Sequence, residues 1–237
     1  MFSRFWYCTV IMLFTILFVF PIIIIGLFDV KKQYTGRLTK YWAKFILIFT
    51  FIDYDFQNDN QLRYNRNYIL VSNHQSFLDI LVIFALFDMP VAFFTKKELF
   101  YIPIFGWALK LAGMVYVDRQ NKDKSKTSVD DGIKKLEKTS LSILVFPEGT
   151  RTEYSSLSKF KKGAFILGVK SKVPIIPITL IYNKKPQIDN FNIKVRLFVD
   201  NPINTLNYNI EQKDVLLVKV KEAINKNLKK LKIEDKN

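Results

Sequence analysis

Cysteine and histidine are almost missing from this 237-residue sequence, in which Cys8 and His74 are the only examples. A disulfide framework needs paired cysteines, and zinc ribbons or multi-histidine metal sites need several cysteine or histidine ligands. The composition therefore excludes these scaffolds and sites. It gives no sign of an oxidising compartment, and we expect neither a bound metal nor an organic cofactor.

Several nucleotide-binding and hydrolase motifs are also missing. The sequence contains no G-x-G-x-x-G and no G-x-S-x-G pattern. Gly163 and Gly168 have the spacing of P-loop glycines, but Val169 stands where that motif requires lysine. Nucleotide binding and serine-elbow hydrolysis are therefore not supported by the sequence.

Positive charge and hydrophobic residues are both abundant. The chain has 36 Lys and Arg against 21 Asp and Glu, a net charge of +15, and it is 49% hydrophobic with 22 phenylalanines. This hydrophobicity excludes a disordered chain, and the length allows a substantial core. The charge predicts an anionic partner, which could be nucleic acid, a phosphate-bearing ligand or an anionic membrane surface.

A long uncharged run lies near the N-terminus. Residues 5–28 contain no charged side chain and, as a helix, would extend roughly 36 Å, enough to cross a bilayer core of about 30 Å. The run is long for a signal peptide, and no small-x-small cleavage site follows it. We therefore predict a hydrophobic helical membrane anchor.

The geometry of this anchor has two interpretations. Pro21 interrupts the first run, and a second apolar stretch, Tyr41–Ile52, is interrupted only by Lys44. Either one helix spans the membrane or a helix–turn–helix lies within one leaflet. Four cations after the first run place that side in the cytosol, namely Lys31, Lys32, Arg37 and Lys40.

The remaining sequence alternates short apolar runs with longer mixed stretches, which predicts an α/β fold with a mixed sheet flanked by helices. The expected strands are Tyr68–Val71, Val91–Phe94, Met114–Val117, Ser142–Phe146, Ile175–Ile181 and Lys194–Val199. The expected helices are Ser76–Phe87, Glu98–Leu111, Lys124–Glu137, Lys161–Lys170 and a surface helix at Ile210–Leu231. We divide the chain into anchoring helices (1–58) and a catalytic domain (59–237).

The only histidine lies in VSNHQSFLD, between an expected strand and an expected helix, with Asp79 five residues after His74. Ser76 and Asp79 have the spacing of a helix capping box, which gives the acid a purely structural interpretation. The alternative is a dyad, in which the carboxylate orients the imidazole and leaves its other nitrogen free to accept a proton.

Three further segments have sequence patterns that suggest a binding or structural role. In LVFPEGTR (144–151), a turn with Glu148, Gly149 and Thr150 follows a strand, and Arg151 offers a fork suited to phosphate. Alone, this segment would suggest an ordinary turn with a solvated arginine. KKELFYIPIFGWALKLAGMVYVDR (96–119) surrounds an amphipathic helix with cations. VPIIPI (173–178) suggests a strand that cannot be fully paired, because two prolines interrupt it.

Taken in order, NHQSFLD, KKELFYIPIFG, FPEGTR and VPIIPI resemble the four sequence blocks of the glycerolipid acyltransferases. The resemblance covers residues 68–179 and is strongest to the bacterial 1-acyl-sn-glycerol-3-phosphate acyltransferase branch. It implies transfer of a fatty acyl group from a thioester, carried by acyl carrier protein or coenzyme A, to the sn-2 hydroxyl of lysophosphatidate.

The resemblance also implies roles for the residues that match these blocks. His74 would be the general base and Asp79 its orienting partner. Lys96 and Arg151 would receive the acceptor phosphate, with Arg119 a weaker candidate. The turn residues Glu148, Gly149 and Thr150 would shape the acceptor site, and VPIIPI would lie near the acyl chain.

These expectations place the catalytic domain at the cytosolic face of the cytoplasmic (inner) membrane, with membrane phospholipids as partners and no nucleic acid. Two alternatives stay open. The same chemistry could act on glycerol-3-phosphate or another lysolipid. A more distant alternative is a non-enzymatic basic protein that binds anionic membranes, which would not depend on His74 or Asp79.

Overall fold

The computed structural model describes residues 2–57, 62, 66–117, 122–152, 156–186 and 192–234. The chain begins with two helices, α1 (Phe2–Phe28) and α2 (Gln33–Phe49). They run antiparallel, because Trp6 Nε1 donates to Phe49 O at 2.8 Å and Trp42 Nε1 donates to Thr15 Oγ1 at 3.3 Å. The two helices therefore form a helix–turn–helix, whereas the placement of this pair in the membrane stays a prediction.

The turn between these helices is built around a buried carboxylate. Asp29 accepts the backbone N–H groups of Gln33 at 3.2 Å and Thr35 at 2.8 Å, so it satisfies donors at the start of α2 that have no partner within the helix. Among the described helices, the one over Ser3–Phe28 is long and apolar enough to cross a membrane, with a mean hydropathy of 3.0.

Seven described strands form one sheet in the order β1–β7–β6–β2–β5–β3–β4. All neighbours are parallel except β6 and β7, which are antiparallel, so the sheet is mixed. The strands are β1 (Asp53–Gln57), β2 (Ile69–Ser72), β3 (Val91–Lys96), β4 (Val115–Val117), β5 (Ser142–Val145), β6 (Ile175–Tyr182) and β7 (Lys194–Val199).

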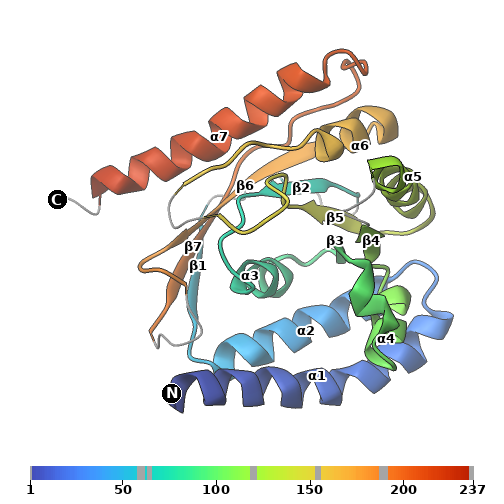
Figure 1. Ribbon diagram of the computed structural model, residues 1–237, viewed down its shortest axis with the longest axis vertical. Helices are drawn as coiled ribbons and strands as arrows, with labels where there is room; N and C mark the ends of the chain where they lie inside the picture. The colour runs from blue at the N-terminus through green and yellow to red at the C-terminus, as the bar shows by residue number, and fades with distance from the viewer. Residues whose placement is uncertain are drawn as a thin grey trace.

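Helices cover both faces of this sheet (Figure 1). On one face lie α1, α2, α3 (Leu78–Leu86) and α4 (Phe105–Leu111), and on the other lie α5 (Lys122–Lys138), α6 (Gly163–Ser171) and α7 (Lys213–Glu234). Each face has its own hydrophobic core. Every residue of β2 is buried, as expected for a central strand covered on both sides. The expected mixed α/β sheet flanked by helices is confirmed.

Two local expectations require correction. The single helix expected over Glu98–Leu111 is instead a 3₁₀ turn, η1 (Lys97–Tyr101), followed by α4, because Pro103 lies between them and proline disfavours helical backbone before it. Strand β1 was not expected at all. Its short polar sequence gives little hydrophobic signal, and only its pairing with β7 identifies it.

VPIIPI contributes Ile175–Ile178, the first half of β6, which pairs with β2 throughout but joins the ladder to β7 only at Ile178, so the expected incomplete pairing is observed on the β7 side. Proline is tolerated here because of the register. The N–H of Ile175 donates to Ile203 O on the side away from β2. Because backbone groups alternate in direction along a strand, the nitrogen of Pro177, two residues later, faces the same side. The ladder to β7 begins only at Ile178, so the missing N–H of Pro177 leaves no acceptor without a partner in that ladder.

The helix pair packs against α3 and α4 on one face of the sheet. A Cβ atom on Gly26 would lie 2.8 Å from Leu111 Cβ, so the glycine allows α1 to approach α4 closely. Leu47 of α2 is fully buried in the same core as β2 and β6. The division at residue 58 stays a prediction, although β1, which lies before that position, belongs to the sheet.

Candidate active site

Four parallel strands end at one edge of the sheet, and the candidate residues follow from their ends. His74 comes after β2, Lys96 ends β3, Arg151 lies beyond β5 and Tyr182 ends β6. Because β6, β2, β5 and β3 are adjacent and parallel, their carboxyl ends share one edge. This is the edge at which open α/β sheets bind ligands.

His74 and Asp79 are in hydrogen-bond contact. The distance between His74 Nδ1 and Asp79 Oδ2 is 2.7 Å, while the side chains are 13% and 0% exposed. The imidazole also stacks on Phe146, with ring centroids 4.0 Å apart and planes at 17°. The ring is therefore held through one nitrogen and one face, and Nε2 is the nitrogen left for another partner.

Asp79 serves as both the helix cap and the partner of histidine that the sequence suggested as alternatives. Its Oδ2 accepts the backbone N–H groups of Gln75 at 2.7 Å and Ser76 at 2.9 Å as well as contacting the imidazole. Ser76 Oγ accepts the N–H of Leu78, the first residue of α3, at 3.3 Å. The two interpretations are therefore compatible, since the carboxylate has enough acceptor positions for both.

Tyr182 completes this network and was not identified from the sequence. Its hydroxyl donates to Asp79 Oδ1, so hydrogen bonds reach both oxygens of the buried carboxylate. Burial raises the pKa of Tyr182 well above its usual value, and the charge and hydrogen bond of Asp79 raise it further. The only sequence signal was a tyrosine at the end of a strand whose edge also carries His74, and such tyrosines are common.

The FPEGTR turn is joined to the histidine loop by Glu148. Its Oε1 accepts His74 N and its Oε2 accepts Ser158 N, both at 2.9 Å, and the residue is 4% exposed. The Glu148 carboxylate thus positions two backbone segments. Thr152 adds to this connection, because its N–H donates to His74 O at 2.8 Å.

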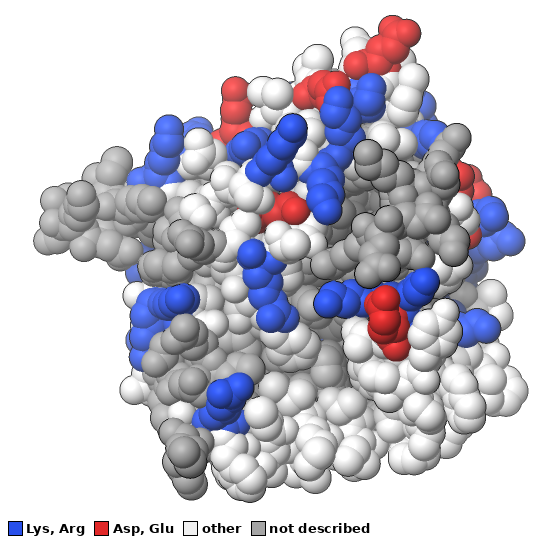
Figure 2. All heavy atoms as spheres, in the orientation of Figure 1, with Lys and Arg blue, Asp and Glu red and all other residues white. Residues whose placement is uncertain are grey.

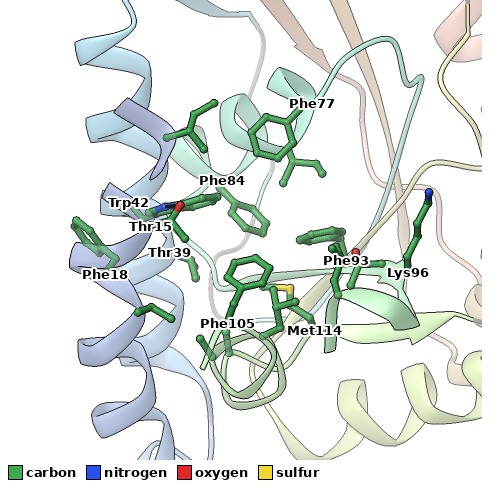
Figure 3. Close-up of a pocket in the computed structure, with 18 of the residues that line it drawn as sticks. Thr15, Phe18, Thr39, Trp42, Phe77, Phe84, Phe93, Lys96, Phe105 and Met114 are labelled. Atoms are coloured by element: carbon green, nitrogen blue, oxygen red, sulfur yellow. Dashed lines mark hydrogen bonds between the residues drawn. The ribbon is translucent and has the colours of Figure 1, made fainter. Parts of the chain in front are cut away.

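A largely apolar cavity of about 900 Å³ reaches from His74 to α1 and α2. Figure 3 shows Trp42 of α2, Phe84 of α3 and Phe105 of α4 directed toward it, with Lys96 on the side away from α1. His74, Lys96, Thr150 and Arg151 line it together, whereas none of the described lining residues comes from VPIIPI. The remaining wall is mainly apolar and includes Ile11, Phe18, Val19, Phe84, Leu99, Phe105 and Met114.

Two cations, Lys96 and Arg151, form the rim of this cavity near His74, and neither has an acidic partner among the described residues. Lys96 and Arg151 are exposed, and neither forms an ion pair within the described parts of the chain. Figure 2 shows blue side chains over the middle of the face, while the lower edge, where α1 lies in Figure 1, is mostly white. Arg119 lies outside the described residues.

Metal ligands are not gathered at this site. Across the ranges that the structure describes, no group of three or more His, Cys, Asp or Glu side chains could hold a metal ion.

Comparisons with known proteins agree with this arrangement. A family model described as Acyltransferase matches residues 53–181, which is more than half of the chain. The chain is 37% identical over 157 residues to the chloroplastic 1-acyl-sn-glycerol-3-phosphate acyltransferase BAT2 of Brassica napus, covering 65% of this chain and 45% of that protein. It is 33% identical over 172 residues to the 1-acyl-sn-glycerol-3-phosphate acyltransferase of Saccharomyces cerevisiae, covering 69% and 56%.

The chain therefore spans about half the length of the curated relatives it matches. The crystal structure of the 1-acyl-sn-glycerophosphate acyltransferase PlsC from Thermotoga maritima has the same fold, with a TM-score of 0.77 at 21% identity. That similarity covers 98% of this chain and 95% of the other. By the extent of the family match, together with the four sequence blocks, this chain belongs to the acyltransferase family.

Proposed function

We propose that this protein transfers a fatty acyl group from a thioester to the sn-2 hydroxyl of lysophosphatidate, which gives phosphatidate. One observation carries the proposal. The His74–Asp79 pair lies at a cavity that is apolar along most of its wall and is bordered by Lys96 and Arg151, which have no acidic partner in the described chain. A base, a site for a hydrocarbon chain and cations for phosphate are what this reaction requires.

The base addresses the weak nucleophilicity of an alcohol. Nε2 of His74 accepts the proton of the acceptor hydroxyl as its oxygen attacks the thioester carbonyl carbon. The tetrahedral intermediate then collapses, the carbon–sulfur bond breaks, and the imidazolium returns the proton to the leaving thiolate. Asp79 orients the ring through Nδ1 and stabilises the positive charge that forms on it.

The acceptor phosphate would lie against the two rim cations. A phosphate monoester carries between one and two negative charges near pH 7. Arg151 offers two parallel N–H donors to its oxygens, and Lys96 adds a point charge from the neighbouring strand. Glu148 holds the turn through two backbone N–H groups and forms no ion pair with Arg151 in the described chain.

The hydrocarbon chain fits the rest of the cavity. Its volume of about 900 Å³ is within the usual range for small-molecule sites. The donor thioester could be carried by acyl carrier protein or by coenzyme A, and no further cofactor is needed for direct attack. The exposed apolar side chains of α1, including Leu13 at 58% and Leu17 at 59%, would hold the protein at the cytosolic face of the cytoplasmic (inner) membrane.

The first test is an acceptor assay with purified protein and a set of variants. The His74→Ala variant should lose at least ~10³-fold in kcat, because the base is removed. The Arg151→Ala variant should mainly raise KM for lysophosphatidate while affecting an acceptor without phosphate much less. Full activity of the His74 variant would refute the mechanism, and equal losses on both acceptors would refute the role of Arg151.

The alternative acceptors, glycerol-3-phosphate and other lysolipids, are separated by the same assay run in competition. If kcat/KM is higher for one of them than for lysophosphatidate, the acyl-transfer mechanism stands and the assigned acceptor changes. If substitution of His74 and of Asp79 leaves the measured acyl transfer to every acceptor unchanged, a non-enzymatic membrane-binding protein would be favoured instead.

A further inference from the structure

The segment 156–162, which lies between two of the sequence blocks, folds back across the FPEGTR turn. Ser158 N donates to Glu148 Oε2 at 2.9 Å, and Lys161 N donates to Pro147 O at 2.7 Å. Phe160, between them, is 4% exposed and belongs to the core beneath α6. These contacts hold the backbone of Lys161 beside the turn although the residue lies outside all four blocks.

The side chain of Lys161 crosses the turn at its glycine. A Cβ atom on Gly149 would lie 2.5 Å from Lys161 Nζ, 2.8 Å from its Cε and 3.2 Å from its Cδ. The same glycine has φ of +76°, where residues with a side chain are strained. Glycine at this position therefore allows the positive φ of the turn and also leaves space for the side chain of Lys161 to pass.

The ammonium group of Lys161 has no acidic partner in the described parts of the chain. Glu148 lies next to Gly149, but both its oxygens accept backbone N–H groups. The adjacent Lys162 differs, since its Nζ is 2.9 Å from Asp214 Oδ2. Lys161 is thus a third cation, with Arg151 and Lys96, that forms no ion pair with a described carboxylate.

We propose that Lys161 is a specificity-determining residue that binds the acceptor phosphate and selects a phosphate monoester over a phosphodiester. The proposal rests on acyl transfer to a phosphate-bearing lysolipid as described above. A monoester carries up to two negative charges near pH 7, whereas a diester carries one, so a third cation favours the monoester. Arg151 supplies the directed fork, while Lys161 supplies a point charge held over Gly149.

Steady-state kinetics of Lys161→Ala test this role. We expect KM for lysophosphatidate to rise about 10-fold and kcat to change less than about 3-fold, because a phosphate contact is lost and the base is intact. Lys161→Arg retains a cation at this position and should restore much of the affinity. Lys162→Ala is the matched control, since its ammonium is already paired with Asp214, and its kinetics should equal those of the wild type.

Selectivity is measured with two competitive inhibitors, an alkyl phosphate and the corresponding alkyl methyl phosphate diester. The wild type should bind the monoester more tightly, and Lys161→Ala should reduce that preference about 10-fold. An unchanged preference refutes the proposal. An increase in KM for acyl-coenzyme A instead of the acceptor would assign the lysine to the donor phosphate and also refute it.

The proposed function and this inference can fail separately. If the wild type does not acylate lysophosphatidate, the proposed function fails, whereas calorimetric binding of the alkyl phosphate still measures the contribution of Lys161. If Arg151→Ala weakens acceptor binding and Lys161→Ala does not, the function stands and the inference fails. Thermal unfolding of each variant establishes that a loss of binding is not a loss of folding.

Discussion

At the scale of single residues, Asp79 combines two tasks that are usually separate. Its carboxylate caps the start of α3 through the backbone of Gln75 and Ser76 and orients His74 through the same oxygen, Oδ2. Complete burial makes each of these hydrogen bonds costly to lose, since no water can replace the missing donor. The backbone at the start of α3 and the orientation of the His74 ring therefore depend on one side chain.

Tyr182 provides the clearest residue-scale prediction. The Tyr182→Phe variant removes the donor to Asp79 Oδ1, and we expect the free energy of unfolding to fall by about 1.5–3 kcal/mol. The less constrained carboxylate should also lower kcat about 10-fold with little change in KM. Denaturant unfolding and steady-state kinetics measure these effects. A wild-type kcat in this variant would show that Tyr182 does not help to position the dyad.

The raised pKa of Tyr182 also predicts how stability depends on pH. Its usual value is 10.0, and burial raises the pKa in the folded protein. The folded state therefore keeps a proton that the unfolded state releases, so this contribution is fully present below pH 10 and is lost as pH rises through the folded-state pKa. Between about pH 8 and pH 11, the wild type should lose more unfolding free energy than Tyr182→Phe does.

At the scale of elements, α2 joins the membrane-seeking part of the chain to the sheet. One of its faces is buried, with Ala43, Ile46 and Leu47 at 0% exposure, while the next residue, Ile48, is 60% exposed. The exposed side chains in the second half of α2 are apolar as well, namely Tyr41, Phe45, Ile48 and Phe49. This part of α2 therefore has a protein-facing side and a side suited to lipid.

Leu47→Ala tests the protein-facing side of α2. The truncation leaves a cavity in the core, so the free energy of unfolding in detergent should fall by about 2–5 kcal/mol. Ile48→Ala is the matched control, and it should change this quantity by less than about 0.5 kcal/mol because the side chain is exposed. Equal effects of the two substitutions would contradict the observed orientation of α2.

At the scale of the whole molecule, the anchor and the catalytic sheet share one core. Tyr7 and Val10 of α1 are 1% and 4% exposed and belong to the same cluster as Leu70 of β2 and Ile178 of β6. The cavity is also shared, because α1 and α2 supply part of its wall and β3 supplies another part. The first two helices thus contribute to the site as well as to membrane attachment.

Removal of residues 1–52 should therefore do more than release the protein from the membrane. It uncovers the apolar surfaces of α3 and α4 that pack against α1 and α2, so we expect the remaining chain to aggregate or to lose its cooperative unfolding transition. Size-exclusion chromatography and calorimetry of the truncated and full-length chains measure this. A soluble, cooperatively folded remainder would support two independent units, as the division at residue 58 predicts.

The sequence by itself determined the features that depend on neighbours along the chain. The apolar run at residues 5–28, the capping-box spacing of Ser76 and Asp79, and most helices and strands follow from local periodicity and turn chemistry. The His74–Asp79 contact could also be anticipated, since five residues that leave a loop for a helix can bring two side chains together. Strand β1 and the break before α4 were missed because local propensity there was weak or misleading.

Only the tertiary structure decided which distant segments meet at the site. Tyr182 reaches Asp79 from 103 residues away, and Lys161 crosses Gly149, because strand order and register bring β6 and the 156–162 segment to the edge that carries His74. The cavity likewise exists only because α1 and α2 lie beside α3, α4 and β3. Such contacts depend on pairing and packing between remote elements, for which neighbouring residues in the sequence carry no signal.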